Sequence, residues 1–332
     1  MLNQLKIEKL FGLYDYDIDL TNDDGSMVKF ITAPNGYGKT TILDFIDGMM
    51  KKSYDKMFEI PFGTFTMFFR ENGSDEKYHV AVQRSDDESD SSDSDVNGIV
   101  AIKLAISLAK TIGSEEKLVE CFVVIRYADG RVETLGDTSN LDMFFVSRTC
   151  HYITDTRLLK RKTDADDEVA AMETISMARY AADMRRILQS PVLKREYAAR
   201  IDGFKRVIDR CEFASKHIEI DERFGIRFVA HDKLETKLSL DQLSSGERHV
   251  IIQVYELLFK AQDGTLVMID EPELSLHMMW QMNYLKNLEE IINLRGFHCI
   301  VATHSPQIFN ALWSKSVDLF TLTQRSPHAE IS

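Results

Sequence analysis

The 332-residue sequence predicts an α/β fold with a mainly parallel core, an antiparallel β-layer and an inserted helical hairpin. Three observations predict this fold class. Apolar strand-like runs alternate with helix-like runs near both ends, β-rich runs fill residues 64–147, and helical spacing dominates residues 164–211. We therefore expect core segments over 1–160 and 219–332, with a helical arm inserted over 161–218.

Composition limits the classes of protein and of partner. The net charge of -13 excludes a uniformly basic protein that binds nucleic acid without specificity. No apolar run approaches the length of a transmembrane helix, and the first residues lack the apolar region of a signal peptide. We therefore expect a cytoplasmic protein without a membrane partner. Isolated spacing and a reducing compartment predict buried free thiols at the four cysteines, Cys121, Cys150, Cys211 and Cys299.

The N-terminal part leads from strands into a glycine-rich loop. Leu5–Leu10 and Tyr14–Leu20 have the composition and alternation of strands. Met27–Thr32 is more continuously apolar, which predicts a buried central strand. The run Ala33–Thr41, A-P-N-G-Y-G-K-T-T, follows it directly, and an apolar helix-like run follows the loop.

The pattern G-x-x-x-x-G-K-[ST] is met at Gly38, Lys39 and Thr40, with Ala33 in place of the first glycine. Glycine lets the backbone turn with positive φ and bring its N–H groups close to phosphates. Lys39 would reach the β- and γ-phosphates, and the Thr40 hydroxyl would bind Mg²⁺. The predicted nucleotide-binding residues here are Asn35, Gly36, Tyr37, Gly38, Lys39, Thr40 and Thr41.

The middle of the chain alternates β-rich runs with turn residues, which predicts the antiparallel layer. The expected strands are Phe65–Arg70, Tyr78–Arg84, Ile99–Ser107, Leu118–Tyr127, Val132–Leu135 and Met143–Ser147. Ile99–Lys110 is equally consistent with a helix. Ser85–Asp95 is dominated by serine and aspartate, so we expect a solvated, disordered acidic loop over 85–97.

Two helices are expected in the arm. Asp164–Gln189 carries apolar residues at helical spacing, and a second helix opens with a Ser190 cap and Pro191 and continues to Cys211. The outer face of this hairpin has more basic than acidic residues. A solvated helical face and a contact to nucleic acid both fit that charge. The basic residues are Arg185, Arg186, Lys194, Arg195, Arg200, Lys205, Arg206 and Arg210.

The C-terminal part again alternates strands and helices, as a parallel core requires. The expected strands are Ile226–Ala230, Leu266–Ile269 and His298–Ala302. The expected helices are Glu247–Lys260, Met278–Leu294 and one that begins in Pro306–Trp313.

Three motifs in this part carry chemistry. L-S-S-G-E opens a helix, with Ser244 suited to capping it. L-V-M-I-D-E-P-E ends an apolar strand with Asp270, which can hold Mg²⁺ through water, and Glu271, which can act as general base on an attacking water. In A-T-H-S-P, His304 follows a buried strand, where it could contact the γ-phosphate.

Together and in this order, these motifs resemble the ABC-type ATPase family, in particular the non-transporter branch that includes RecF, the SMC proteins and the overcoming-lysogenization-defect (OLD) ATPases. E-P-E-L-S-L-H and A-T-H-S-P are similar to OLD-like ATPases of bacterial anti-phage defence systems. The resemblance covers residues 1–50 and about 225–325. It implies an ABC-type P-loop core that binds ATP and Mg²⁺ and dimerises, as a homodimer or a higher even oligomer.

The resemblance also implies roles for single residues. It implies Lys39 and Thr40 on phosphate and magnesium, Asp270 on magnesium, Glu271 as catalytic base, His304 as the switch histidine and Ser275–His277 as the dimer-crossing D-loop. The signature would contact the γ-phosphate of the opposite subunit through Ser244, Ser245, Gly246 and Glu247.

One departure from the family concerns its Q-loop glutamine, which is expected near Tyr152–Leu158. That segment has no glutamine, and Asp155 or Thr156 is the substitute available. Slow hydrolysis is therefore expected.

Three functions compete at this point. The leading one is an ATPase that controls a separate effector, a nuclease or toxin, because the stretch after His304 is too short for the nuclease domain that OLD proteins carry there. A DNA-repair or chromosome-structuring ATPase of the RecF or SMC kind would use the basic hairpin on nucleic acid. A transporter nucleotide-binding subunit would use Tyr14 to stack on adenine.

Overall fold

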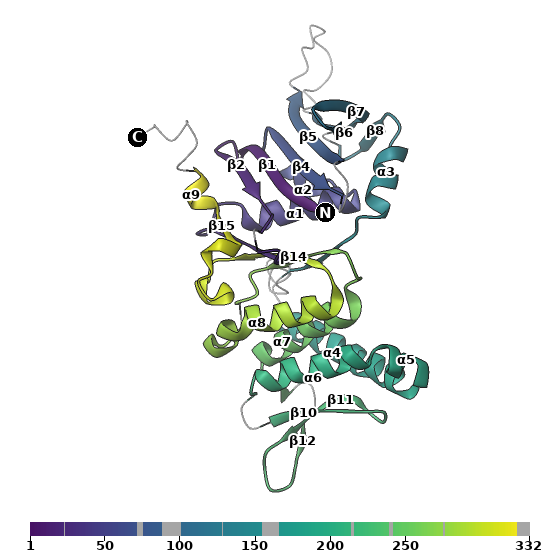
Figure 1. Cartoon of the computed structure of the whole chain (residues 1–332), viewed down its shortest axis with the longest axis vertical. Coiled ribbons are helices and arrows are strands. Elements are labelled where there is room, and N and C mark those ends of the chain that lie inside the picture. Colours follow the sequence, from purple (N-terminus) through teal and green to yellow (C-terminus); the bar gives the residue numbers. More distant parts are fainter. Residues whose placement is uncertain are drawn as a thin grey trace. The chain divides into compact units, whose positions relative to one another are not determined.

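The structure is a computed structural model that describes the chain except for residues 23, 72–75, 88–100, 128, 155–165, 214–215, 239–241, 275 and 324–332. Two compact units make up the chain (Figure 1). The first unit comprises residues 1–150 and 314–332, and the second comprises residues 151–313. The three-part division expected from the sequence stays a prediction.

A seven-stranded antiparallel sheet dominates the first unit and confirms the predicted antiparallel β-layer (Figure 1). Its strand order is β2-β1-β4-β5-β6-β7-β8. The strands are β1 (Leu2–Leu10), β2 (Tyr14–Asp19), β4 (Thr64–Arg70), β5 (Lys77–Asp87), β6 (Ala101–Ile112), β7 (Glu115–Arg126) and β8 (Val132–Leu135).

One face of this sheet is buried because its strands alternate apolar and polar residues. Leu5 of β1 pairs with Met67 of β4, Ile7 pairs with Phe65, and all four side chains are buried. Helix α1 (Lys39–Lys51) covers them with Phe45, whose ring centre lies 5.4 Å from that of Phe65 in an edge-on arrangement. The helix that follows the glycine-rich loop is thereby fixed to the sheet.

The first unit also holds a parallel pair of strands. All five residues of β3 (Val28–Thr32) are buried, as the apolar run predicted, and β3 pairs in parallel with β15 (Ser316–Asp318). Helix α9 (Leu319–Thr323) follows β15 and contacts β2 and β3, while α2 (Asp55–Glu59) follows α1. The glycine-rich loop therefore lies between the buried strand β3 and helix α1, which is packed on the sheet.

One predicted strand in this unit is wrong. Met143–Ser147 lies mostly in helix α3 (Ser139–Val146), because Leu141, Phe144 and Phe145 recur at helical spacing and turn inward together. The Phe144 ring lies 5.2 Å from that of Phe69. The other ambiguous run, Ile99–Lys110, is strand over its described residues, as part of β6.

The acidic loop was expected to begin at Ser85, but β5 continues to Asp87, where it pairs with Ala101 of β6. Hairpin pairing therefore overrides the acidic composition there, and residues 88–97 of the predicted loop lie outside the described residues. Cys121 is exposed rather than buried, because the alternation of β7 turns Phe122 to the core instead. Of the other cysteines, Cys150 is half-buried, and Cys211 and Cys299 are buried.

The second unit is a layer of helices with a parallel strand pair and a small antiparallel sheet. In Figure 1, α4, α6, α7 and α8 pack against one another. Its helices are α4 (Asp166–Gln189), α5 (Pro191–Glu196), α6 (Ala198–Arg210), α7 (Ser245–Tyr255), the π-helix η3 (Glu256–Lys260), α8 (Met278–Arg295) and the 3₁₀ turns η4 (Pro306–Phe309) and η5 (Trp313–Lys315). Its strands are β9 (Cys150–Ile153), whose first residue belongs to the first unit, β10 (Lys216–Asp221), β11 (Gly225–Ala230), β12 (Lys237–Leu238), β13 (Leu266–Asp270) and β14 (His298–Thr303).

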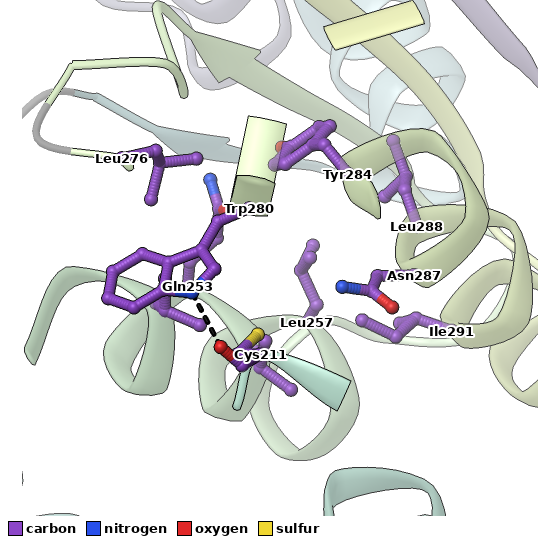
Figure 2. Close-up of a pocket in the computed structure, with 11 residues that line it drawn as sticks. Cys211, Gln253, Leu257, Leu276, Trp280, Tyr284, Asn287, Leu288 and Ile291 are labelled. Atoms are coloured by element: carbon purple, nitrogen blue, oxygen red, sulfur yellow. Dashed lines mark hydrogen bonds between the residues drawn. The ribbon is translucent and has the colours of Figure 1, made fainter. Parts of the chain in front are cut away.

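Aromatic rings and one small cavity mark the packing of these helices. The Tyr255 ring of α7 stacks 4.4 Å from Tyr180 of α4. Figure 2 shows a cavity of about 30 Å³ between α7, α8 and Cys211, whose carbonyl accepts a 2.6 Å hydrogen bond from Trp280 Nε1. Typical small-molecule pockets are about tenfold larger, so the cavity belongs to helix packing.

Two helices differ from their predicted form. The helix expected from Ser190 to Cys211 is broken at Tyr197 into α5, which buries no residue, and α6, which buries Phe204, Val207 and Ile208. Packing therefore stabilises only the second half of the apolar stripe. The helix expected within Pro306–Trp313 is a 3₁₀ turn, because the backbone enters the left-handed region at Asn310 and Ala311.

Candidate nucleotide-binding site

The glycine-rich loop has the backbone that a phosphate cradle needs. Gly36 has φ of 90° and Gly38 φ of 88°, in the left-handed region that favours glycine. Gly38 is also the N-cap of α1, and a Cβ there would lie 2.6 Å from Leu10 Cδ2. The loop can therefore present its N–H groups and the positive end of α1 to an anion.

Lys39 lies folded against this loop. Its side chain is buried, and Nζ donates to the carbonyl oxygens of Ala33 at 2.9 Å and of Pro34 at 3.3 Å. The same ammonium can donate to phosphate oxygens. Ala33 is itself buried and its φ is not positive, so the backbone does not require glycine there.

An aromatic cluster supports the loop from one side. The Tyr16 hydroxyl donates to the Tyr37 carbonyl at 2.9 Å, and burial raises the pKa of Tyr16, so this donor keeps its hydrogen. The Tyr37 ring stacks 5.3 Å from Tyr14 and meets Phe320 edge-on at 5.6 Å. Tyr14, the expected adenine-stacking residue, thus packs on the loop itself.

In the second unit, parallel pairing brings the predicted catalytic residues together. β13 and β14 pair so that Asp270 lies opposite Ala302, and both strands end at the same edge. Asp270 is buried at this edge, Glu271 follows it, and His304 follows β14. The Glu271 N–H donates to the Ala302 carbonyl at 2.8 Å, although Glu271 has φ of 45°. Such strained backbone is common at functional sites.

A further carboxylate, which sequence reasoning missed, contacts the histidine. Glu273 Oε1 lies 3.0 Å from His304 Nδ1 and accepts a 2.8 Å hydrogen bond from the His304 backbone N–H. Glu271 Oε1 lies 4.0 Å from the same Nδ1. In the sequence, the signal for this residue was the second glutamate of E-P-E. In the structure, its side chain is buried a few residues after the end of β13.

The signature residues form a helix cap. Ser244 and Glu247 make a reciprocal capping box at the start of α7, with bonds of 2.8 and 3.3 Å. Glu247 is buried and also contacts Lys216 Nζ at 2.9 Å, so its carboxylate serves the fold here. Gly246 is buried, whereas Ser244 and Ser245 are exposed. The contact of these residues with nucleotide stays a prediction.

Other predicted residues are placed only in part. Ser275 of the D-loop segment lies outside the described residues, and His277 caps α8 by accepting from the Met279 N–H at 3.3 Å. The proposed substitutes for the Q-loop glutamine, Asp155 and Thr156, also lie outside the described residues.

Each unit offers an oxygen that suits Mg²⁺. Thr40 stands in the first turn of α1 in the first unit, Asp270 stands at the edge of β13 in the second unit, and hydroxyl and carboxylate oxygens are ligands that Mg²⁺ prefers. Bound Mg²⁺ would neutralise charge on the phosphates. Across the part of the chain that the structure describes, we find no helix with the length and apolarity to span a bilayer.

Two curated proteins are similar to part of this chain. The "Retron Ec83 probable ATPase" of Escherichia coli is 32% identical over 105 residues, which cover 28% of this chain and 19% of the relative. "Protein ea59" of Escherichia phage lambda is 31% identical over 88 residues, which cover 26% of this chain and 16% of the relative. The chain thus matches less than a fifth of the length of either relative.

Solved structures resemble the chain over most of its length, at low identity. The SMC head domain from Thermotoga maritima has a TM-score of 0.44 and 16% identity, over 93% of this chain and 91% of that one. An SmcHead bound to the C-winged helix domain of ScpA has a TM-score of 0.47 and 13% identity, over the same shares.

A family model covers most of the chain. It is described as "AAA domain, putative AbiEii toxin, Type IV TA system", and it matches residues 34–310. With a probable ATPase of a retron as a relative, this match confirms the expected P-loop ATPase of the non-transporter kind. The chain belongs to this AAA_21 family of P-loop ATPases.

Proposed function

We propose that two copies of this chain close head to tail on two ATP molecules, hydrolyse them, and thereby control a separate effector, a nuclease or toxin, in anti-phage defence. The observation that carries the proposal is the edge of β13 and β14, where Asp270, Glu271 and His304 gather. Two carboxylates beside a histidine can together activate a water molecule next to a phosphate.

The roles follow from exposure and position. The Glu271 side chain is 26% exposed, so its carboxylate can reach an attacking water and accept its proton. His304 is 43% exposed and can donate to the γ-phosphate. Lys39 and the loop N–H groups would hold the β- and γ-phosphates, and the Thr40 hydroxyl and the Asp270 carboxylate would be the ligands offered to Mg²⁺.

The exposed start of α7 supports the dimer. Ser244 and Ser245 stand in solvent at the N-terminus of an 11-residue helix, where N–H groups and the helix dipole favour an anion. In the proposed dimer this anion is the γ-phosphate held by Lys39 of the other copy. ATP then joins the two chains, and its hydrolysis releases them.

The relatives support the role in defence and the effector. The curated relative that comes from a retron is named a probable ATPase, and the description of the matched family mentions a putative toxin. The mention of a toxin in that description is why the proposal includes a separate effector.

The nucleic-acid alternative is weakened by ion pairs on the basic hairpin face. Arg206 and Arg210 both contact Glu290, at 2.8 and 2.7 Å, and Arg200 contacts Asp263 at 3.6 Å. Part of the positive charge of these arginines is therefore used in ion pairs that hold α6 in place. A test for nucleic-acid binding should change Lys205, which is exposed, rather than these residues.

A mixing experiment tests the dimer. Lys39→Ala removes the loop cation, and Ser245→Arg blocks the signature, so we expect each variant alone to be nearly inactive as an ATPase. Mixed, they form a dimer in which the intact loop of one chain faces the intact signature of the other, and activity should return.

The control mixes Lys39→Ala with a chain that carries both changes. No site in that mixture combines two intact halves, so it should stay inactive. If the first mixture also stays inactive while both variants bind each other, the shared site is wrong. If Glu271→Gln turns ATP over like the unaltered chain, the assigned base is wrong.

A further inference from the structure

We propose that Glu273 is a positioning residue that fixes the tautomer and orientation of His304. This inference deepens the proposed function and rests on it for the catalytic consequence alone. The contact between Glu273 and His304 lies within the second unit and is present without nucleotide.

The contact geometry defines which nitrogen carries hydrogen. Glu273 Oε1 accepts from the His304 backbone N–H at 2.8 Å and lies 3.0 Å from Nδ1. A carboxylate oxygen accepts hydrogen bonds, so the Nδ1 that faces it must be the donor. The hydrogen of a neutral His304 is then on Nδ1, and Nε2 points away from Glu273 with its lone pair available.

The burial of the Glu273 side chain indicates that its role is to position His304. Its side chain is 4% exposed, against 43% for His304, so the carboxylate approaches the ring from the protein side. Among the described residues, Glu273 Oε2 is buried without a hydrogen-bond partner. A buried carboxylate with one unpaired oxygen costs stability. An apolar side chain would serve packing better, which favours a role toward His304.

The backbone after His304 is held as well, so the contact is not free to drift. Ser305 Oγ donates to Gln281 Oε1 at 2.9 Å, and Gln281 Nε2 donates to the Leu276 carbonyl at 3.1 Å. The turn that carries Glu273 and the strand end that carries His304 are thus linked at a second point through α8. The backbone beside His304 is therefore held by contacts besides that of Glu273.

In the proposed reaction this arrangement has one consequence. A histidine fixed through Nδ1 presents only Nε2 outward, and the carboxylate beside it stabilises the imidazolium, as a buried acid does for other catalytic histidines. In the imidazolium both ring nitrogens carry hydrogen, so it is in this charged form that the outward Nε2 donates to a phosphate oxygen. Loss of Glu273 should lower kcat more than it raises KM, because ATP is held mainly by the loop.

The first test needs no nucleotide. Long-range ¹H–¹⁵N spectra of the ¹⁵N-histidine-labelled full chain distinguish the two tautomers, and His304→Ala identifies the signal by its loss. We expect the Nδ1–H form in the unaltered chain and a shift toward the Nε2–H form in Glu273→Ala. An Nε2–H form in the unaltered chain, or no change in the variant, would overturn the proposal.

The second test is a double-mutant cycle on ATP turnover. Glu273→Ala should lower kcat roughly 10- to 100-fold in the unaltered chain, and cause little further loss in a His304→Ala background. An equal loss in both backgrounds would mean a merely structural role and overturn the proposal.

Glu273→Gln guards against a variant that does not fold. It keeps the size and an accepting carbonyl oxygen, so it should fold, keep the Nδ1–H tautomer and lose less activity than Glu273→Ala. If the unaltered chain hydrolyses no ATP, the proposed function fails, and the spectra still decide the role of Glu273.

Discussion

Two elements that carry the predicted site residues, one in each unit, are built in opposite ways. The phosphate loop of the first unit consists of consecutive residues, and its chemistry comes from backbone N–H groups and two left-handed glycines, Gly36 and Gly38. The carboxylate–histidine edge of the second unit consists of side chains from two strands, β13 and β14, that parallel pairing brings together. The loop depends on local conformation, and the carboxylate–histidine edge depends on tertiary contacts.

This difference separates two tasks. A backbone cradle recognises phosphate in the ground state, so changes there should act on ATP affinity. In the proposed reaction the side chains of Glu271, Glu273 and His304 act on the attacking water, so changes there should act on turnover. Changes at Glu271 and at Lys39 test whether binding and chemistry divide in this way.

The largest effect is expected for Glu271→Gln. The amide keeps the size of the carboxylate and removes the general base, so kcat should fall about 100- to 10,000-fold. ATP affinity, measured with a fluorescent analogue, should stay close to that of the unaltered chain. A parallel loss of affinity would contradict the division of tasks.

Lys39→Ala should act on ATP affinity rather than on kcat. Hydrogen bonds from the ammonium to phosphate are charge-assisted, each worth about 1.5–3 kcal/mol, so ATP affinity should fall roughly 10- to 100-fold. Thermal unfolding without ATP should change little, because among the described residues the hydrogen bonds of Nζ go to two loop carbonyls. Lys52→Ala, which removes a cation just after α1, is the matched control and should leave affinity unchanged.

The same difference explains how much the sequence could predict. The conformation of the loop was predictable, because consecutive residues from Ala33 to Thr41 carry it, and its contact with nucleotide stays a prediction. Asp270, Glu271 and His304 were predictable as strand-end residues, but the contact of Glu273 with His304 was not. That contact depends on the register of β13 against β14 and on the turn at Glu271, which the residue pattern does not encode.

Gly38→Ala should cost more than Gly36→Ala, although both glycines have φ near 90°. A left-handed alanine costs about 1–2 kcal/mol of unfolding free energy at either position. At Gly38 the new Cβ would also lie 2.6 Å from Leu10 Cδ2, whereas nothing lies within 4 Å at Gly36. Urea unfolding of both variants measures the difference. Equal losses would mean that the Leu10 side chain moves aside.

The smallest effect is expected for Ala33→Gly, which restores the family's first glycine. Ala33 is buried without a positive φ, and Lys39 contacts its carbonyl oxygen rather than its side chain. Glycine should therefore add no ATP affinity. It should lower the free energy of unfolding by about 0.4–1 kcal/mol, because the unfolded chain gains conformational freedom. A gain in affinity would instead show that the Ala33 methyl group restricts the cradle, and that side chains as well as backbone determine phosphate binding in the first unit.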